Sequence, residues 1–178
     1  MLDGEDETLL VMLVQNGDVA AFERLLLRLH QPMRNYVTKM VGAAMADDVL
    51  QEISLQMYRQ VRFLREPKAL RPWVYRIATR LAFLHLKREK RWRQVETQFR
   101  NELSTSALPH QEEIDSEFLG MIDHVSPASR AVLLLHYQQN LSIEETATIL
   151  DIPVGTAKSR LSYGVSVLRN LVKEKQAI

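Results

Sequence analysis

Apolar residues recur with helical spacing in nearly every segment of this chain, and glycine and proline are sparse. In the first 41 residues, three apolar stripes are separated by breaks at Asn16-Gly17-Asp18 and at Pro32. This pattern predicts three short helices, over about 9–14, 21–29 and 33–41. Short helices with brief connections are typical of an antiparallel bundle.

The segment 47–61 predicts a helix with two contrasting faces. Its inward face is apolar and holds Val49, Leu50, Ile53, Met57 and Val61. Its outward face is polar around one apolar residue and holds Asp48, Gln51, Glu52, Arg59 and, in the middle, Leu55. Such a face is a candidate protein-contact patch. The alternative is a solvated face with one stray leucine, which is common.

The next segment is predicted to be a loop over 62–72, broken by Pro67 and by Pro72, which suits the first turn of a helix. The helix that follows has an apolar face made of Val74, Ile77, Leu81 and Leu84. A separate basic stripe along it consists of Arg76, Arg80 and Lys87, flanked by Thr79 and Phe83.

Positive charge is concentrated in the stretch from Arg59 to Arg93. Twelve of the 23 basic residues lie there, whereas only Glu66 and Glu89 are acidic. Aromatic residues are interleaved with them: Phe63, Trp73, Tyr75, Phe83 and Trp92. Cations beside flat rings suit single-stranded nucleic acid, because phosphates attract charge and unstacked bases stack on rings. The alternative is a solvated basic helix that covers a core.

The character of the chain changes at Gln94. The segment 94–117 contains six acidic residues against one arginine, together with Ser104-Thr105-Ser106 and Pro109. It is predicted to be a flexible acidic linker. The expected fold is therefore all-α, with a helical bundle over 1–93 and a second small helical domain over 118–178.

The second domain carries clear helix boundaries. Ser126-Pro127 predicts an N-cap before a helix over 128–139. Ser142 and Glu145 form a capping box for a helix that ends at Leu150. After the break at 151–153, a last helix is predicted over 154–172. Two helices joined by a short turn predict a helix-turn-helix, whose second helix enters the major groove of DNA.

The last helix also separates into faces. Its buried face is predicted to hold Ala157, Leu161, Val165, Leu168 and Val172. Small polar groups and cations lie on the rest: Thr156, Lys158, Ser159, Arg160, Ser162, Tyr163 and Ser166. Hydroxyls can form hydrogen bonds with base edges, and cations can bind phosphates or guanine. The alternative is a purely structural helical hairpin. Gly164 in mid-helix indicates close packing.

Composition excludes several kinds of site. The chain has no cysteine, which rules out disulfides and thiolate metal sites. No phosphate-cradling glycine-rich loop is present, and no metal-site spacing joins the histidines, which are His30, His85, His110, His124 and His136. We expect no catalytic residue, metal or cofactor. No secretory signal and no apolar run of roughly 20 residues is found, so we expect a cytoplasmic protein without membrane insertion.

Three stretches resemble, in order and spacing, the extracytoplasmic-function (ECF) sigma factors of the sigma-70 family. DDVLQEISLQMYRQV is similar to the helix that binds core polymerase, RPWVYRIATRLAFLHLKR to the promoter-melting region, and LSIEETATILDIPVGTAKSRLS to the fourth conserved region. The resemblance covers about residues 8–173. It implies a transcription initiation factor that binds core RNA polymerase, double-stranded −35 DNA and the opened −10 strand, with an anti-sigma factor as a further partner.

The resemblance assigns roles to particular residues. Polymerase binding falls to Asp48, Gln51, Glu52 and Leu55. Contacts to the −10 strand fall to the loop 62–71 and the following helix, through Arg62, Lys68, Arg76, Arg80, Lys87 and Arg88. Reading of the −35 element falls to Thr156, Lys158, Ser159, Arg160, Ser162 and Tyr163.

The chain departs from the family pattern at four positions. The family usually has Asn, Asp, Arg and Ala where this chain has Arg80, Leu84, Tyr163 and Gly164. Its −10 specificity is therefore the least transferable property. The alternative function is a stand-alone helix-turn-helix regulator that uses only 120–173, but it leaves the 47–61 face and the basic stripe without a role.

Overall fold

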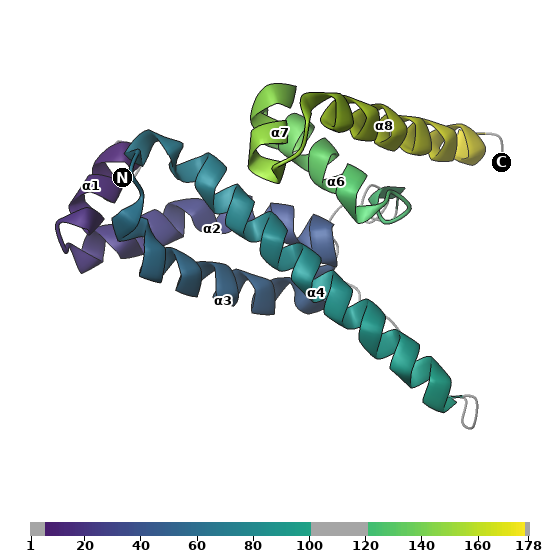
Figure 1. The fold of residues 1–178 in the computed structure, drawn as a ribbon, viewed down its shortest axis with the longest axis horizontal. Coiled ribbons are helices and arrows are strands. Elements are labelled where there is room, and N and C mark those ends of the chain that lie inside the picture. The colour runs from purple at the N-terminus through teal and green to yellow at the C-terminus, as the bar shows by residue number, and fades with distance from the viewer. Residues whose placement is uncertain (1–5, 101–120, 177–178) are drawn as a thin grey trace.

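The computed structural model describes the backbone of residues 6–100 and 121–176, and side chains of residues 6–91 and 121–174. Every regular element in these residues is helical, which confirms the all-α prediction. Figure 1 shows α1–α4 as one body, with α6, α7 and α8 lying across it. The predicted linker starts inside a helix, since α4 runs to Arg100, and its remaining residues lie outside the described ones.

The first body begins with α1 (Glu7–Gln15), whose N-terminus is capped by the Asp6 side chain. The chain turns at Gly17, where φ is +91°, and Asp18 caps α2 (Val19–Val41) by accepting a hydrogen bond from the Ala21 amide. The predicted break at Asn16-Gly17-Asp18 is thus confirmed. Aspartate caps satisfy amides that the first turn of a helix leaves without partners.

The predicted break at Pro32 is wrong, because α2 continues through it to Val41. An interior proline removes one backbone hydrogen bond and costs about 3 kcal/mol in an isolated helix. Burial on both sides of the proline offsets this cost, since Leu29 and Met33 lie in the core. Tertiary packing therefore overrides the local signal.

Helices α3 (Ala43–Gln60) and α4 (Leu70–Arg100) complete the bundle. Short 3-10 turns, Val61–Phe63 and Pro67–Ala69, connect them. Both predicted apolar faces are largely buried, through Val49, Ile53, Met57 and Val61 on one side and Val74, Ile77 and Leu81 on the other. Leu84, the fourth residue of the predicted apolar face of α4, is 43% exposed. The second half of α4 projects past the bundle, so the helix has fewer neighbours there (Figure 1).

A polar pair lies inside this bundle. The hydroxyls of Tyr36 and Thr79 are 2.6 Å apart, and Thr79 also donates to the Tyr75 carbonyl. Burial raises the pKa of Tyr36 well above its ordinary value. The pair joins α2 to α4 without leaving either hydroxyl unsatisfied, which a buried polar group requires.

The helices of the second body begin within one residue of the predicted positions, but α8 ends four residues later than predicted, at Gln176. Ser126 caps α6 (Pro127–Leu133), and the chain continues as a π-helical segment, Leu134–Gln138. The Ser142–Glu145 capping box opens α7 (Ile143–Leu150). Asp151, at φ +53° and ψ +50°, turns the chain into α8 (Val154–Gln176).

Gly164 is buried where α8 crosses α6. A Cβ at this position would lie 2.7 Å from Leu133 Cδ1 and 3.1 Å from Leu133 Cγ, so the predicted close packing is confirmed. We expect Gly164→Val to lower the free energy of unfolding by about 1–3 kcal/mol through overpacking. Gly155→Val is the matched control, since a Cβ on Gly155 has nothing within 4 Å. Equal denaturation midpoints for the two variants would contradict the packing argument.

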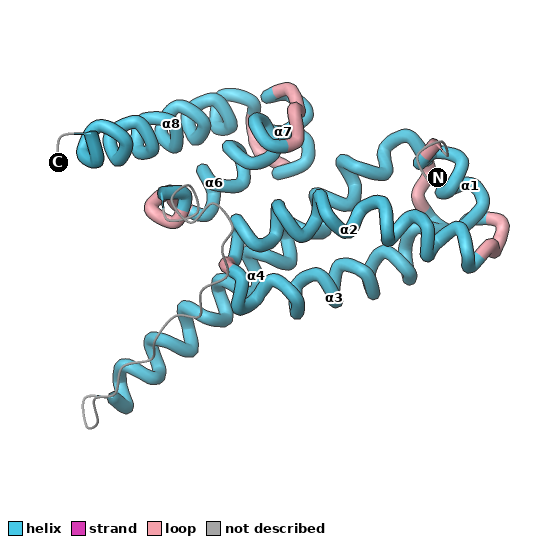
Figure 2. Tube along the Cα trace, turned by 180° about the vertical axis from the view of Figure 1, so that it is seen from behind, coloured by secondary structure: helices cyan, strands magenta, loops and turns pink. Residues whose placement is uncertain are grey.

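The two bodies are docked on each other. Apolar residues of both, among them Ile53 and Leu81 of the first and Leu135 and Ile149 of the second, belong to one continuous buried cluster. Figures 1 and 2 show α6 and α7 seated over α2 and α4, with α8 on the outside. The second body therefore covers part of α4.

Candidate nucleic-acid interface

The outward face of α3 carries the residues predicted to bind polymerase. Asp48 and Gln51 are exposed, and Leu55 is 49% exposed between them and the C-terminal end of the helix. Glu52 differs, because its carboxylate lies 3.0 Å from His85 Nε2 and 3.9 Å from Arg88 Nη1, both on α4. Of the four residues predicted to bind polymerase, Asp48, Gln51 and Leu55 are therefore free of contacts to α4.

A neighbouring apolar feature was not anticipated from the sequence. Leu27 of α2 is exposed, and it borders a hollow of about 190 Å³ between α2 and α3 that Leu26, His30, Leu50 and Ser54 also line. The run of three leucines, 25–27, was a usable signal, since a single helical stripe cannot bury all three. The hollow adds apolar surface to the α2–α3 side of the molecule.

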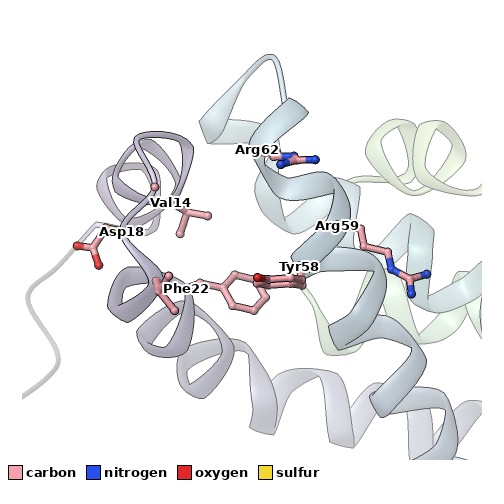
Figure 3. A pocket seen from close by; sticks show the side chains of 8 residues that line it. Val14, Asp18, Phe22, Tyr58, Arg59 and Arg62 are labelled. Carbon is pink, nitrogen blue, oxygen red and sulfur yellow. The ribbon is translucent and has the colours of Figure 1, made fainter.

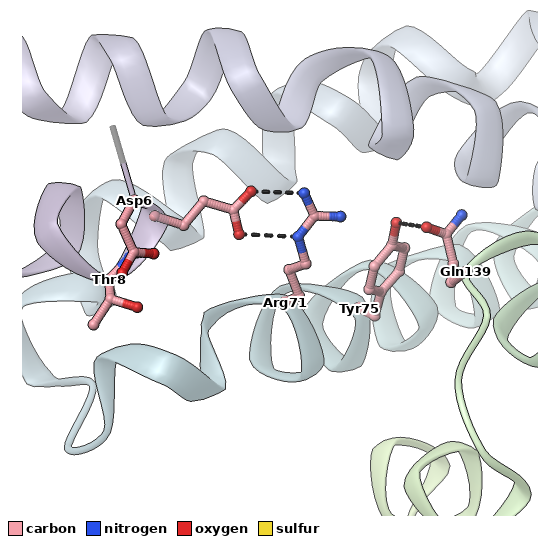
Figure 4. Close-up of polar contacts among 6 residues, drawn as sticks. Asp6, Thr8, Arg71, Tyr75 and Gln139 are labelled. Atoms are coloured by element: carbon pink, nitrogen blue, oxygen red, sulfur yellow. Dashed lines mark hydrogen bonds and ion pairs between the residues drawn. The ribbon is translucent and has the colours of Figure 1, made fainter. Parts of the chain in front are cut away.

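The loop 62–71 is held in place from α1. Gln15 Nε2 donates to the Leu64 carbonyl at 2.7 Å, and the Arg71 guanidinium donates two hydrogen bonds, of 2.9 and 2.7 Å, to the Glu7 carboxylate (Figure 4). This carboxylate raises the pKa of Arg71. Sequence reasoning missed Glu7 and Gln15, because no local pattern links positions that are 49 or 64 residues apart.

The loop presents cations and an aromatic ring to solvent. Arg62 and Lys68 are exposed, and the Phe63 ring is 68% exposed. The Arg62 guanidinium carbon lies 4.7 Å from the centre of this ring, within the range of a cation–π interaction. Two of the predicted −10 residues and one aromatic residue are thus brought together on this loop.

The basic stripe on α4, made of Arg76, Arg80 and Lys87, is exposed, and so is Arg88 beside it. Arg80 Nη2 donates to Gln56 Oε1 at 2.8 Å, which directs it toward α3. Arg76 Nη2 donates to the Thr148 carbonyl at 2.7 Å, in the last turn of α7. One of the predicted −10 contacts is therefore engaged by the second body.

Beside Arg76, the Tyr75 hydroxyl donates to Gln139 Oε1, in the turn before α7 (Figure 4). Tyr75 is buried, and this burial raises the pKa of Tyr75 to about 12. The hydroxyl therefore stays protonated at neutral pH and remains a donor. Tyr75 and Arg76 together form a polar joint between α4 and the second body.

The helix α8 presents most of its predicted reading face to solvent. Lys158, Ser159, Ser162 and Tyr163 are exposed, while Thr156 and Arg160 are half-buried. The Ser159 hydroxyl donates to the Gly155 carbonyl at 3.0 Å. Ala157 is fully buried against the rest of the domain, which fixes the rotation of this face.

The prediction that Val172 is buried is wrong, since it is 40% exposed. Its neighbours on that face, Val165 and Leu168, are only half-buried. All three border an open, mainly apolar hollow of about 520 Å³ that also touches Leu133 and Ile122. The C-terminal turns of α8 extend past α6, and no other described helix lies beside them (Figure 1).

Comparison with known families matches both bodies. The family model of sigma-70 region 2 matches residues 25–92, and that of sigma-70 region 4 matches residues 116–165. The RNA polymerase sigma-H factor of Pseudomonas aeruginosa is 29% identical over 175 residues, covering 90% of this chain and 91% of that protein. The ECF RNA polymerase sigma-E factor of Escherichia coli is 29% identical over 180 residues, covering 94% of each.

Solved structures share the fold. CnrH in complex with the cytosolic domain of CnrY superposes with a TM-score of 0.70 at 18% identity, covering 94% of this chain and 97% of CnrH. The sigma factor RpoE in complex with the anti-sigma factor NepR, from Bartonella quintana, superposes with a TM-score of 0.67 at 22% identity, covering 87% and 98%.

Two matched regions in this order, on two docked helical bodies, define a sigma factor with regions 2 and 4. The chain belongs to the sigma-70 family and, within it, to the ECF sigma factors. In the described part of the chain, no helix is long and apolar enough to cross a membrane. The same residues contain no group of three or more side chains suited to hold a metal ion.

Proposed function

We propose that this chain is a transcription initiation factor that brings core RNA polymerase to promoters by three surfaces acting together. Asp48, Gln51 and Leu55 on α3 contact the polymerase. The loop 62–71 and the stripe on α4 hold the opened −10 strand, and α8 reads the −35 duplex. The observation that carries this proposal is the presence of both sigma-70 regions in one chain, in the order the resemblance requires.

A stand-alone helix-turn-helix regulator is not favoured. It uses only the second body, and it leaves the region 2 match over residues 25–92 and the exposed cations of α4 without a role. The chain supplies binding energy and no catalytic group of its own. Because its partner is the polymerase, the chain acts in the cytoplasm.

We further propose an anti-sigma factor as a regulatory partner. The support is the shared fold with two sigma factors that were solved in complexes, RpoE with the anti-sigma factor NepR and CnrH with the cytosolic domain of CnrY. The open apolar hollow beside α8 and the exposed face of α3 are both available on the surface of the described residues.

The decisive experiment is run-off transcription by core polymerase on a library of randomised promoters. We expect transcripts only when the chain is added, with enrichment of one −35 and one −10 sequence. Enrichment of a −35-like sequence in DNA binding without any stimulation of transcription would support the stand-alone regulator instead. The selected −10 sequence also shows what Arg80 and Leu84 have changed relative to the family pattern.

The −35 assignment gives a separate expectation for Arg160. Replacing Arg160 by alanine should weaken binding to the selected −35 duplex by about 1–3 kcal/mol and relax the preference at one base pair. Lys173→Ala, an exposed cation near the end of the same helix, is the control. Fluorescence anisotropy over a range of salt concentrations measures both. A uniform loss across sequences with a shallower salt slope would show a phosphate contact instead.

A further inference from the structure

The helix α1 reaches the loop 62–71 from both of its ends. At its C-terminal end, Gln15 donates a hydrogen bond of 2.7 Å to the Leu64 carbonyl, inside the loop. At its N-terminal end, Glu7 accepts two hydrogen bonds from Arg71, where the loop ends. Between these points α1 packs against both 3-10 turns. A helix of nine residues is about 13 Å long and stiff, so it holds the two points at a fixed spacing.

The α1 helix is itself fixed in the bundle. Leu10 and Val11 are fully buried in the core, and the Asp6 side chain caps the helix. The Glu7 side chain is only 18% exposed, and its paired bonds to one guanidinium are stronger and more directional than a single ion pair at the surface. The helix can therefore act as a fixed support for the loop.

The loop has little packing of its own to fix its shape. Its flanks, Val61 and Leu70, are buried. Most side chains between them are exposed, namely Arg62, Phe63, Arg65, Glu66 and Lys68. Its backbone hydrogen bonds are local, from the Leu64 amide to the Val61 carbonyl and from the Ala69 amide to the Glu66 carbonyl. A segment with few buried contacts opens easily, so a bond that reaches it from another helix has a large influence on its shape.

A hollow beside the start of the loop adds to the importance of Gln15. The hollow has a volume of about 350 Å³ and lies between the α1–α2 turn and the C-terminal end of α3, with Val14, Tyr58 and Arg62 in its lining (Figure 3). Because protein side chains do not fill this space, packing alone leaves the loop room to shift toward the α1–α2 turn. The hydrogen bond from Gln15, the last residue of α1, limits this shift.

We propose that α1 positions the loop that binds the −10 strand, with Gln15 and Glu7 as its positioning residues, and thereby sets both the affinity and the base preference for that strand. A loop with several shapes binds more weakly, because the apparent affinity falls with the fraction of molecules in the competent shape. It also discriminates less, since other bases find shapes that accept them. This inference rests on the proposed function, in which the loop holds the −10 strand.

The test uses holoenzyme made from core polymerase and the full chain. Its ligand is fork-junction DNA that carries a single-stranded −10 element, either the sequence selected by run-off transcription or one of its single-base variants. We expect Gln15→Met, which keeps the length of the side chain but removes the donor, to weaken binding of the selected sequence about ten-fold. This corresponds to the cost of ordering about one backbone residue. The affinity ratio between the selected and variant sequences should fall as well.

Glu7→Gln tests the other end of α1. We expect a similar loss of affinity and of base preference. The substitution removes a negative charge, which by itself favours the binding of phosphates, so a loss of affinity reports the position of the loop rather than charge. Tighter binding to every −10 sequence with a steeper salt slope would mean that Glu7 only neutralises Arg71, and would overturn its positioning role.

The double variant shows whether the two residues act together. Since loss of either contact already releases the loop, the loss of affinity in Gln15→Met with Glu7→Gln should be smaller than the product of the two single losses. A loss equal to that product would mean two independent contacts and would contradict a common role of the two residues.

Matched controls separate the possible failures. Gln31→Met makes the same change at an exposed glutamine that donates to Asn35 at 2.9 Å, within α2, and Glu174→Gln removes an exposed carboxylate of α8. Both should bind −10 DNA like the wild type. For all variants, affinity for the −35 duplex should stay within about two-fold, which shows that the chain is folded.

Two outcomes have different meanings. If Gln15→Met and Glu7→Gln keep the wild-type affinity and base preference while the wild type supports run-off transcription, the positioning role of α1 is wrong and the proposed function stands. If wild-type holoenzyme neither transcribes nor binds the −10 strand, the proposed function itself fails.

Discussion

Replacement of Arg130 by alanine is expected to lower the free energy of unfolding by about 3 kcal/mol. Arg130 is only 7% exposed, although it is charged. Its Nη1 donates to the Lys39 and Met40 carbonyls, at 3.3 and 3.2 Å, and its Nη2 donates to the Asp123 and Val125 carbonyls, at 3.0 and 3.2 Å.

The physical reason lies at the end of α2. The last four carbonyls of a helix have no partner inside the helix, and the negative end of the helix dipole lies there. Arg130, from the second body, supplies donors and positive charge to this end of α2. Burial lowers the pKa of Arg130, and the Asp123 carboxylate, 2.9 Å away, opposes that shift. Without the guanidinium, buried carbonyls of both bodies lose their partners.

Two measurements check this expectation. Urea denaturation followed by circular dichroism gives the loss of stability, and small-angle scattering gives the radius of gyration, which should increase because Arg130 joins the two bodies. Arg130→Lys should recover only part of the stability, since a lysine keeps the charge but lacks the planar fork of donors. Arg169→Ala, at an exposed arginine of α8, is the control and should stay within about 0.5 kcal/mol of the wild type. An unchanged urea midpoint for Arg130→Ala would refute the argument.

The double substitution Asp48→Lys and Gln51→Lys is expected to weaken binding to core RNA polymerase by at least ten-fold. Both side chains are exposed on α3, so the fold has no reason to change. Placing two cations in a surface that is complementary to a partner costs several kcal/mol when like charges meet, which corresponds to a ten-fold loss or more. Competition with a labelled sigma factor for core polymerase gives the affinity.

The choice of residues follows from the contacts of Glu52. A substitution of Glu52 also breaks its interactions with His85 and Arg88, so a loss of binding would mix a surface effect with a packing effect. Glu174→Lys reverses an exposed charge at the far end of α8 and is the matched control. Core affinity equal to that of the wild type in the double variant would rule out this face of α3 as the polymerase contact.

Because the two bodies are docked on each other, one cation of the basic stripe on α4 is already hydrogen-bonded within the protein. The hydrogen bond from Arg76 to the Thr148 carbonyl competes with any phosphate that approaches the same guanidinium. Exposed hydrogen bonds and ion pairs of this kind contribute little to stability, so a phosphate can replace the carbonyl at small cost. The contact of Tyr75 differs from that of Arg76, because Tyr75 is buried between the two bodies, where its hydroxyl donates to Gln139 Oε1.

Much of the fold follows from local sequence. The capping box at Ser142 and Glu145, the cap at Ser126 and the apolar face of α3 were all predictable, because each depends on residues within one or two helical turns. The tight packing at Gly164 was predictable for a related reason, since a glycine in mid-helix costs stability unless something approaches closely. The polar face of α3, the basic stripe of α4 and the polar face of α8 were found in the same way, from faces of single helices, whereas the role of the loop 62–71 came from the resemblance.

Other features were decided only by the tertiary structure. The continuation of α2 through Pro32 depends on burial by other helices, and the exposure of Leu84 and Val172 depends on where those neighbours end. The clamp between Glu7 and Arg71 and the capping of α2 by Arg130 join residues 64 and about 90 positions apart. A periodic pattern shows which side of a helix is apolar, but it carries no information on which distant segment covers that side. The sequence thus determined the helices and their faces, and packing determined which faces meet.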